Sequence, residues 1–299
     1  RPLQGSKFVH PPDQTTADTD ELARQDGALA RLAGLLADSD RTVVLSGAGC
    51  STASGIPDYR DSAGQWKRPQ PVQYQDFVRD PATRQRYWAR SFVGWERIRS
   101  AAPNRAHEAL AALEARGKIA HLVTQNVDGL HQRAGSRQVT DLHGRLDNVD
   151  CLECGASCDR TMFQNRLRTE NPGWRPKAAA PAPDGDADLD PESCAAFNVP
   201  TCDNCSGMVK PSVVFFGESV PRERVERAWA EVNQADLLLV AGSSLMVFSG
   251  FRFARGAAQR GVPVAAINLG RTRADDMLTV KVEADCGLAL DRLRLRLDA

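Results

Sequence analysis

Residues 42–49 constrain the fold more than any other segment. A short, largely β-branched run, Thr42-Val-Val-Leu45, leads into Ser46-Gly-Ala-Gly49. A strand, a glycine-rich turn and then a helix are typical of the first unit of a dinucleotide-binding α/β sheet, because small residues let backbone amides approach a pyrophosphate. The glycine motif is incomplete, since Thr52 stands where a third glycine is expected. Taken alone, the segment is equally compatible with an ordinary turn.

Similar apolar runs recur along the chain and alternate with helical stretches. We expect further strands at 119–124, 235–241, 262–268 and 278–282, and helices at 21–38, 81–98, 104–114 and 222–233. Alternating strands and helices predict a parallel sheet covered on both faces, and strands that are apolar throughout agree with burial on both faces. The predicted fold class is therefore α/β, a Rossmann-like doubly wound parallel sheet.

Two segments interrupt this alternation. Residues 58–99 are rich in Pro, Gly and aromatic residues, and 148–205 contain two Cys-x-x-Cys pairs around a Pro/Ala/Asp-rich stretch at 171–191 that we expect to be an exposed loop. We interpret both segments as one smaller, zinc-binding and helical lobe inserted into the sheet domain. The predicted organisation is a flexible tail at 1–20, a sheet domain from 21–57, 100–147 and 206–299, and a small lobe from 58–99 and 148–205.

The cysteine pairs indicate a metal site. They are Cys151 with Cys154, and Cys202 with Cys205, and a glycine follows each pair closely. Four thiolates in a tetrahedral arrangement favour Zn²⁺, and four protein ligands leave no position open for a substrate. The predicted zinc is therefore structural. Two unrelated pairs or a redox motif are the alternatives, because the spacing between the pairs is long.

Two further segments follow predicted strands at their carboxyl ends. Gly242-Ser-Ser244 follows the strand at 235–241, and Asn268-Leu-Gly270 follows the next one. Ligands of open α/β sheets bind outside these strand ends, so both segments are candidate ribose and phosphate contacts. Each could equally be a plain helix N-cap.

Charge and composition exclude some classes of partner. Lys plus Arg and Asp plus Glu both total 38, so the formal net charge is zero, which argues against nucleic acid as a partner. No apolar run reaches the roughly 18 residues that a membrane-spanning helix needs. The Ala- and Arg-rich composition suggests a bacterial source and hence the cytoplasm, with the mitochondrial matrix as the eukaryotic alternative. We expect a monomer.

Several ordered blocks resemble the sirtuin signatures and span nearly all of the chain after residue 40. They are Gly47-Ala-Gly-Cys-Ser-Thr-Ala-Ser-Gly-Ile-Pro-Asp-Tyr-Arg60, Thr124-Gln-Asn-Val-Asp-Gly-Leu-His131, Leu142-His-Gly144, the two cysteine pairs, Val213-Val-Phe-Phe-Gly-Glu218, Gly242-Ser-Ser244 and Asn268-Leu-Gly270. Tyr87-Trp-Ala-Arg90 and the long cysteine spacing resemble the class II branch, to which the mitochondrial sirtuin-4 type belongs. Cys50 and Tyr59 depart mildly from the usual Ile and Phe.

This resemblance implies an NAD-dependent protein-lysine deacylase, for which NAD is a consumed co-substrate and O-acyl-ADP-ribose a product. His143 matches the general base, and imidazole suits that role because it exchanges protons near neutral pH. Asn126 and Asp128 match the polar pair around the nicotinamide pocket and ribose, and complete the predicted catalytic set. The other implied cofactor contacts are Gly47, Ala48, Gly49, Ser51, Asp58, Tyr59, Arg60, Gln125, Val127, Gly242, Ser243, Ser244, Asn268, Leu269, Gly270 and Cys286.

The resemblance also implies where an acylated-lysine protein or peptide binds. Val214, Phe216 and Gly217 match the segment that pairs with the peptide as an added strand and walls the acyl-lysine tunnel, although a plain core strand also explains the apolar run. Tyr87 and Arg90 are three residues apart on a predicted helix and resemble a pair that holds a carboxylate on the acyl chain. An acidic acyl group is therefore the expected preference; the alternative is an aromatic helix face with a solvated Arg.

Three other functions compete with deacylation. A mono-ADP-ribosyltransferase would use the same NAD site, and the sequence does not separate the two. A zinc-bearing binding adaptor with a degenerate nucleotide fold is disfavoured by the intact Asn126, Asp128 and His143. A nicotinamide dehydrogenase is disfavoured by the incomplete glycine motif. The remaining histidines of the ordered blocks and helices, His107, His121 and His131, are expected to be structural.

Overall fold

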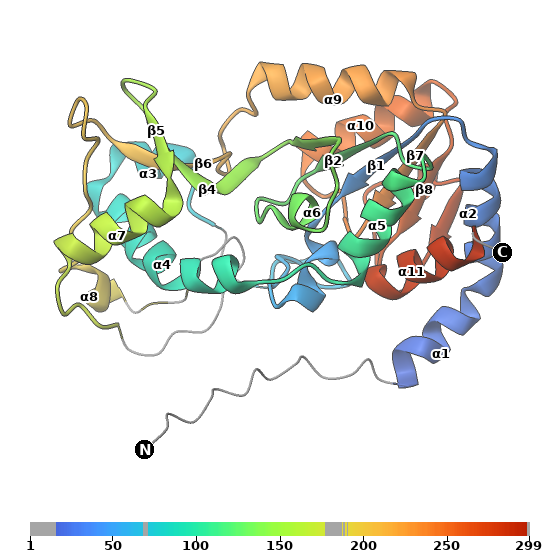
Figure 1. The fold of residues 1–299 in the computed structure, drawn as a ribbon, viewed down its shortest axis with the longest axis horizontal. Coiled ribbons are helices and arrows are strands. Elements are labelled where there is room, and N and C mark those ends of the chain that lie inside the picture. The colour runs from blue at the N-terminus through green and yellow to red at the C-terminus, as the bar shows by residue number, and fades with distance from the viewer. Residues whose placement is uncertain (1–15, 68–70, 177–186, 188, 190, 298–299) are drawn as a thin grey trace.

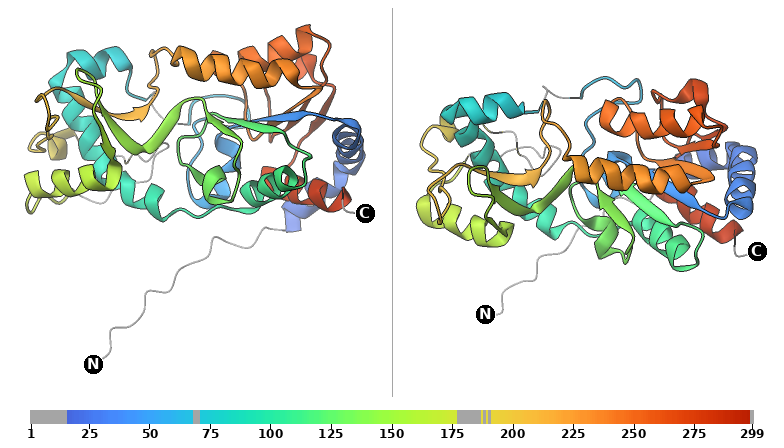
Figure 2. Two further views of the ribbon diagram at one scale, coloured as in Figure 1. Left: turned by 45° about the horizontal axis from the view of Figure 1, so that its top comes forward. Right: turned by 90° about the horizontal axis from the view of Figure 1, so that it is seen from above.

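The structure, a computed structural model, describes residues 16–67, 71–176, 187, 189 and 191–297. Figure 1 shows two lobes side by side, a larger one on a parallel sheet and a smaller one around a short antiparallel sheet. The same two lobes remain separate in both views of Figure 2. The predicted tail at 1–20 is described only from Thr16, where helix α1 (Thr16–Arg24) begins, so its last residues are helical.

The larger lobe is built on a six-stranded parallel sheet with the order β3-β2-β1-β7-β8-β9. Its strands are β1 (Thr42–Ser46), β2 (His121–Thr124), β3 (Val139–Asp141), β7 (Leu237–Ala241), β8 (Val264–Ile267) and β9 (Val280–Val282). Strands β2 and β3 follow β1 in the sequence and lie on one side of it, whereas β7, β8 and β9 come later and lie on the other side. The crevice outside the carboxyl ends of β1 and β7 is thus the topological switch point, where doubly wound sheets bind ligands.

Helices cover both faces of this sheet, which confirms the predicted fold class. Helices α2 (Asp26–Asp38), α5 (Arg105–Ala115) and α11 (Cys286–Arg296) pack on one face, and α9 (Arg222–Gln234) and α10 (Phe248–Gln259) pack on the other (Figure 1). Along β1 the side chains alternate between the faces, with Val44 towards the first layer and Val43 and Leu45 towards the second. Burial on both faces explains why the strand is apolar throughout.

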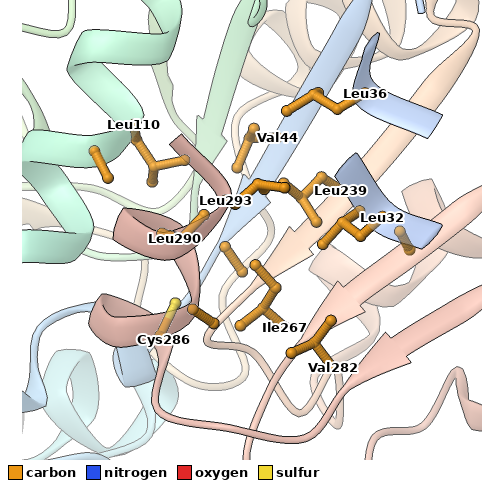
Figure 3. Close-up of a cluster of buried hydrophobic side chains, with 14 of the residues drawn as sticks. Leu32, Leu36, Val44, Leu110, Leu239, Ile267, Val282, Cys286, Leu290 and Leu293 are labelled. Atoms are coloured by element: carbon orange, nitrogen blue, oxygen red, sulfur yellow. The ribbon is translucent and has the colours of Figure 1, made fainter. Parts of the chain in front are cut away.

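Figure 3 shows the core of the first layer. Leu110 from α5 and Leu290 and Leu293 from α11 meet Val44 and Leu239 of the sheet, and all five are almost completely buried. Burying one such side chain completely is worth about 1.5–3 kcal/mol. This layer holds β1 and β7 in place and thereby fixes the loops that leave their carboxyl ends.

The smaller lobe contains an antiparallel sheet with the order β5-β4-β6. Its elements are α3 (Tyr74–Arg79), α4 (Pro81–Ser100), β4 (Gly144–Cys151), β5 (Ser157–Asp159), α7 (Arg160–Glu170), α8 (Pro191–Cys194) and β6 (Val209–Val213). Trp88 and Phe163 lie completely buried in its core. Strand β6, from the range that we assigned to the sheet domain, pairs with β4 in this smaller sheet. The lobe ranges themselves stay a prediction.

Local sequence signals explain where several helices begin. Asp80 caps α4 by accepting hydrogen bonds from the backbone N–H groups of Ala82 and Thr83, and Pro81 occupies the first turn, where no N–H is needed. Asn104 and Asp285 cap α5 and α11 in the same way. The predicted helix at 21–38 is divided at Gln25 into α1 and α2. Most of the predicted loop at 171–191 lies outside the described residues.

Within the described ranges, no helix has both the length and the apolar character that crossing a bilayer requires.

Candidate active site

A cavity of about 730 Å³ lies at the switch point, between the sheet and the smaller lobe. Its volume is in the range of small-molecule and cofactor sites. His143 lies in the same cavity as Gly47, Asn126 and Ser243, so the residues predicted to act together are brought together. The predicted residues that line the cavity are Gly47, Ala48, Gly49, Ser51, Asp58, Tyr59, Arg60, Tyr87, Arg90, Gln125, Asn126, Val127, Asp128, His143, Val214, Phe216, Gly217, Gly242, Ser243, Ser244, Asn268 and Leu269.

Glycines allow the loops after β1 and β7 to interlock at one end of the cavity. The backbone N–H of Gly49 donates to the carbonyl of Gly242 over 2.8 Å. A Cβ on Gly49 would lie 2.9 Å from Gly242 Cα, and one on Gly242, whose φ is +61°, would lie 2.5 Å from Cys50 N. Both contacts are too close for a real side chain, so these positions require glycine. Without side chains at these positions, a phosphate group can approach the backbone of both loops closely.

The helix expected directly after the glycine turn is absent. Residues 48–50 and 52–54 form two short 3₁₀ turns, and the second one ends at Gly55 in the left-handed conformation. Ser51 lies between the turns, and Pro57 follows two residues after Gly55. Small hydroxyl residues and a glycine favour turns over a continuous helix. No α-helix N-terminus therefore points into the cavity from this turn, and the N–H groups of Cys50 and Ser51 donate to carbonyls within the turn itself.

Asn126, Asp128 and Ser51 form a hydrogen-bonded group in the cavity wall. The Asn126 side-chain amide donates to the Gly47 carbonyl over 3.0 Å and to Ser51 Oγ over 3.1 Å. Ser51 Oγ donates to one carboxylate oxygen of Asp128 over 2.7 Å, and the Leu130 backbone N–H donates to the other over 2.9 Å. These bonds fix the orientation of the carboxylate and the amide before any ligand binds.

His107 and His131 lie behind this group and away from the cavity lining. Their rings stack with centroids 4.8 Å apart, and His131 Nε2 lies 2.8 Å from Ser46 Oγ. Burial lowers the pKa of His107 to about 4 and that of His131 to about 3, so both are neutral near pH 7. Their burial agrees with the structural role expected for both.

His143 is the histidine that lines the cavity. Its Nδ1 lies 3.0 Å from the carbonyl oxygen of Gln125, and its Nε2 lies 2.8 Å from Ser249 Oγ. Burial lowers its pKa to about 4, and the nearby Arg252 and Arg224 act in the same direction, while the Gln125 carbonyl raises it. The imidazole is therefore neutral at physiological pH. A neutral imidazole can accept a proton, as a general base must.

The loop that contains the predicted cofactor contacts Asp58, Tyr59 and Arg60 carries an aromatic cluster. Tyr59, Trp66 and Phe216 meet edge to face with ring centroids 5.5–6.0 Å apart. The Arg60 guanidinium stacks 4.0 Å from the Trp66 ring centroid, and Asp58 forms an ion pair with Lys67. The cluster links the loop to the segment predicted to bind the substrate.

That segment begins immediately after β6 ends at Val213. The backbone N–H of Val214 donates to the His143 carbonyl over 2.8 Å, and the Phe216 carbonyl accepts from the Tyr74 backbone N–H over 2.8 Å. Val214, Phe216 and Gly217 line the cavity beyond the strand. The alternative of a plain core strand therefore applies to β6 and not to these three residues.

Tyr87 and Arg90 line the same cavity from helix α4. Tyr87 is buried against Phe77 and Phe215, with ring centroids 5.5 and 5.0 Å away. Arg90 Nε donates to the Ala187 carbonyl over 2.8 Å, which orients its guanidinium. The two side chains thus share a wall of the cavity, as their spacing predicted.

Two predicted cofactor residues do not line the cavity. Gly270 packs against the loop at Ser62, where a Cβ would lie 2.3 Å from the Ser62 carbonyl oxygen. Cys286 is buried in the core, with its Sγ 3.5 Å from Cys50 Sγ. Contact of either residue with a bound cofactor stays a prediction.

Ser249 and Trp66 line the cavity and were missed by the sequence reasoning. Ser249 lies outside the Gly242-Ser-Ser244 block, near the start of the next helix, α10. The only signal was its position, because a polar residue at the start of a helix that follows a sheet strand points towards the ligand crevice. No sequence signal indicated Trp66, because apolar residues do not recur at a regular spacing in the loop that contains it.

The four predicted zinc ligands come together in the smaller lobe. Their sulfur atoms all lie within 4.8 Å of one another, with Cys151 3.5 Å from Cys205 and Cys154 3.7 Å from Cys202. In a tetrahedral site with Zn–S bonds of about 2.3 Å the sulfurs are about 3.8 Å apart, so the cluster fits Zn²⁺. None of the four lines the cavity. The site therefore suits a structural metal.

Comparisons with known proteins agree with this arrangement. A model described as the Sir2 family matches residues 47–249. An "NAD-dependent protein deacetylase" of Xanthomonas campestris pv. campestris (strain 8004) is 63% identical over 250 residues, 84% of this chain and 85% of the relative. The human "NAD-dependent protein lipoamidase sirtuin-4, mitochondrial" is 49% identical over 252 residues, 83% of this chain and 80% of the relative.

Solved structures give the same result. One described as "Structural Basis for the Mechanism and Regulation of Sir2 Enzymes" has a TM-score of 0.72 and 31% identity and covers 91% of this chain and 98% of its own. Another, "Sir2-p53 peptide-NAD+", has a TM-score of 0.70 and 31% identity, with coverage of 90% and 96%.

Proposed function

Because the chain belongs to the Sir2 family, we propose that it is an NAD-dependent protein deacylase that removes acyl groups from lysine side chains. One water is consumed, and the products are free lysine, nicotinamide and O-acyl-ADP-ribose. One observation supports this function above others: the interlocked glycine loops, the Asn126–Asp128 pair and a neutral His143 line one cavity. The human relative at 49% identity agrees with a class II resemblance.

Each group in the cavity suits one step of this reaction. NAD, when bound, would supply the ribosyl carbon that the acyl oxygen attacks as nicotinamide leaves, and the ribose hydroxyl that carries the acyl group in the product. We assign the diphosphate to the loops at Gly47–Gly49 and Gly242–Ser244, and the nicotinamide half to the wall formed by Asn126 and Asp128. His143 accepts the proton of a ribose hydroxyl at its Nε2. The loop with Tyr59 and Trp66 lines the site and would shield the ribosyl carbon from bulk water until the acyl oxygen attacks it.

We place the acylated peptide along residues 214–217. This segment lies on the cavity wall directly after β6, and its Val214 N–H is hydrogen-bonded to the backbone of His143. A peptide added beside it would bring the acyl-lysine to the base. Such β-augmentation uses main-chain hydrogen bonds, so it tolerates many sequences. Solved relatives are described with a p53 peptide and with a propionylated peptide, which supports a peptide as the partner.

The function is tested with an acyl-peptide panel and NAD, analysed by mass spectrometry. We expect NAD-dependent release of unmodified peptide together with equal amounts of nicotinamide and O-acyl-ADP-ribose. The competing mono-ADP-ribosyltransferase would instead add ADP-ribose to protein and leave the acyl group in place. Nicotinamide release with no deacylated peptide on any member of the panel would reject the proposed function.

The acyl preference is a second part of the proposal. Arg90, oriented by the Ala187 carbonyl, lies with Tyr87 on one wall of the cavity, and an Arg can hold a carboxylate through two parallel hydrogen bonds. We therefore expect glutaryl, succinyl or hydroxymethylglutaryl peptides to react faster than acetyl peptides. Charge-assisted hydrogen bonds are worth roughly 1.5–3 kcal/mol, so the preference in kcat/KM should be about 10- to 100-fold.

Arg90→Ala should remove this preference and leave acetyl turnover nearly unchanged. Arg97→Ala is a matched control, because Arg97 lies on the same helix, is exposed and does not line the cavity. A lipoyl peptide belongs in the panel, since the human relative is named a lipoamidase. An equal loss on acidic and acetyl peptides would exclude a carboxylate-binding role for Arg90.

The bacterial deacetylases among the relatives favour the cytoplasmic location that the composition suggested. The monomeric state and the absence of nucleic acid and membrane partners stay predictions.

A further inference from the structure

The surroundings of His143 define which of its nitrogens carries the proton. Nδ1 lies 3.0 Å from the carbonyl oxygen of Gln125, and a carbonyl can only accept a hydrogen bond. The proton of the neutral ring is therefore on Nδ1, and the lone pair is on Nε2. Ser249 Oγ, 2.8 Å from Nε2, must then be the donor in this second bond. A serine hydroxyl can rotate to donate in this way.

Ser249 is itself held firmly at the start of α10. Its carbonyl accepts a hydrogen bond from Arg252 Nε over 3.0 Å. The next residue, Gly250, packs so closely on the Gln125 side chain that a Cβ there would lie 2.4 Å from Gln125 Oε1. Gln125 supplies the carbonyl that binds His143 Nδ1, so the start of α10, Gln125 and the imidazole form one packed unit.

Ser249 also lies on a wall between two cavities. With Phe248 it lines both the cavity of His143 and a second cavity of about 570 Å³, which Arg252 and Glu218 also line. A change of one χ1 rotamer can therefore carry the hydroxyl away from Nε2 when another hydroxyl needs that nitrogen.

We infer that Ser249 is a positioning residue for the His143 base: its hydroxyl donates to Nε2 and holds the ring with that lone pair in the reactive cavity until a substrate hydroxyl replaces it. The inference rests on the proposed deacylase function for its catalytic meaning. The two hydrogen bonds of His143 support the positioning role of Ser249 whether or not the protein turns over an acyl peptide.

A serine hydroxyl can donate to the lone pair of the neutral ring and can accept from Nε2–H of the protonated ring, so its removal takes a partner from both forms of His143. The charged groups around His143 are Arg252 on α10, Arg224 on α9 and Glu218 on the loop before α9, whose carboxylate pairs with Lys210. Ser249→Ala leaves all of them in place and removes one hydrogen bond to the neutral ring. Because both forms of the ring lose a partner, we expect the acid limb of kcat/KM against pH to move little and the loss to appear in kcat.

The test compares Ser249→Ala with Ser249→Thr, which keeps the hydroxyl, and with Ser219→Ala, which removes a hydroxyl from the second cavity's wall. We expect Ser249→Ala to lower kcat about 3- to 10-fold with little change in KM, as befits one lost positioning hydrogen bond. Ser249→Thr should restore most of the rate, and Ser219→Ala should match the parent. A kcat of Ser249→Ala equal to that of the parent, or equal effects of the two alanine variants, would overturn the inference.

A spectroscopic readout separates this inference from the proposed function. The ¹⁵N shifts of the His143 imidazole, assigned through His143→Gln, should show protonated Nδ1 and hydrogen-bonded, unprotonated Nε2 in the parent. In Ser249→Ala the ¹⁵N signal of Nε2 should move to the chemical shift of an unprotonated nitrogen that accepts no hydrogen bond. This result stands even if no acyl peptide is turned over, whereas a parent ring with its proton on Nε2 rejects the assignment.

Discussion

Replacing His143 with alanine should nearly abolish deacylation and leave the fold and NAD binding intact. His143 is the histidine in the cavity, and its pKa of about 4 keeps it ready to accept a proton at neutral pH. A positioned general base contributes about 10²- to 10⁴-fold in rate. We expect kcat to fall by that factor, which corresponds to about 3–5.5 kcal/mol of transition-state stabilisation.

The measurement is single-turnover formation of O-acyl-ADP-ribose, with the NAD-induced rise in Tm as a separate readout of binding. His121→Gln is the matched control, because His121 is a buried histidine that is bonded to Thr140 in the sheet and does not line the cavity. It should keep the parental rate. A rate for His143→Ala within tenfold of the parent would mean that the base is another group.

The sequence predicted the sheet well where strands are buried on both faces. Strands β1, β2, β7 and β8 coincide with the apolar runs, because double-sided burial leaves a continuous apolar signal, and the edge strand β9 lies within the predicted run at 278–282. Strand β3 was missed, since Val139-Thr-Asp141 is short, lies at the sheet edge and is largely polar. An edge strand has one neighbour and less need of an apolar sequence.

The sequence predicted which residues form the candidate site but not the hydrogen bonds between them. Ordered blocks identified His143, Asn126 and Asp128, but the tautomer of His143 depends on a backbone carbonyl of Gln125, to which any residue type could contribute. The prediction of a helix after Gly49 was wrong for a related reason. A strand followed by a glycine turn does not specify whether the next residues form a helix or 3₁₀ turns. Backbone geometry of this kind follows from tertiary packing.

The second large effect concerns the zinc site. Cys151 ends β4, and Cys202 and Cys205 lie on the loop that leads into β6, so a metal ties the two strands together where they pair. Structural zinc in small isolated domains contributes about 10–16 kcal/mol, and this lobe also has its own apolar core. We therefore expect Cys202→Ser, or removal of the metal by a strong chelator, to unfold the smaller lobe and to lower Tm markedly.

Cys158→Ser provides the matched control, because Cys158 lies on β5 of the same small sheet but outside the four-sulfur cluster. It should retain one zinc per chain by elemental analysis and the parental melting curve, whereas Cys202→Ser should retain neither. If both variants keep the metal and melt alike, the four sulfurs do not bind zinc.

Loss of the metal should also lower the deacylase activity, although none of the four cysteines lines the cavity. Strand β4 runs from Gly144, directly after His143, to Cys151, and its partner β6 leads directly into Val214, whose N–H binds the His143 carbonyl. A lobe that loosens at the cysteine end therefore releases both backbone segments that hold the base and the proposed peptide site. We expect deacylation to fall together with the unfolding of this lobe, while the parallel sheet, whose strands and covering helices lie in the other lobe, retains its helical circular dichroism.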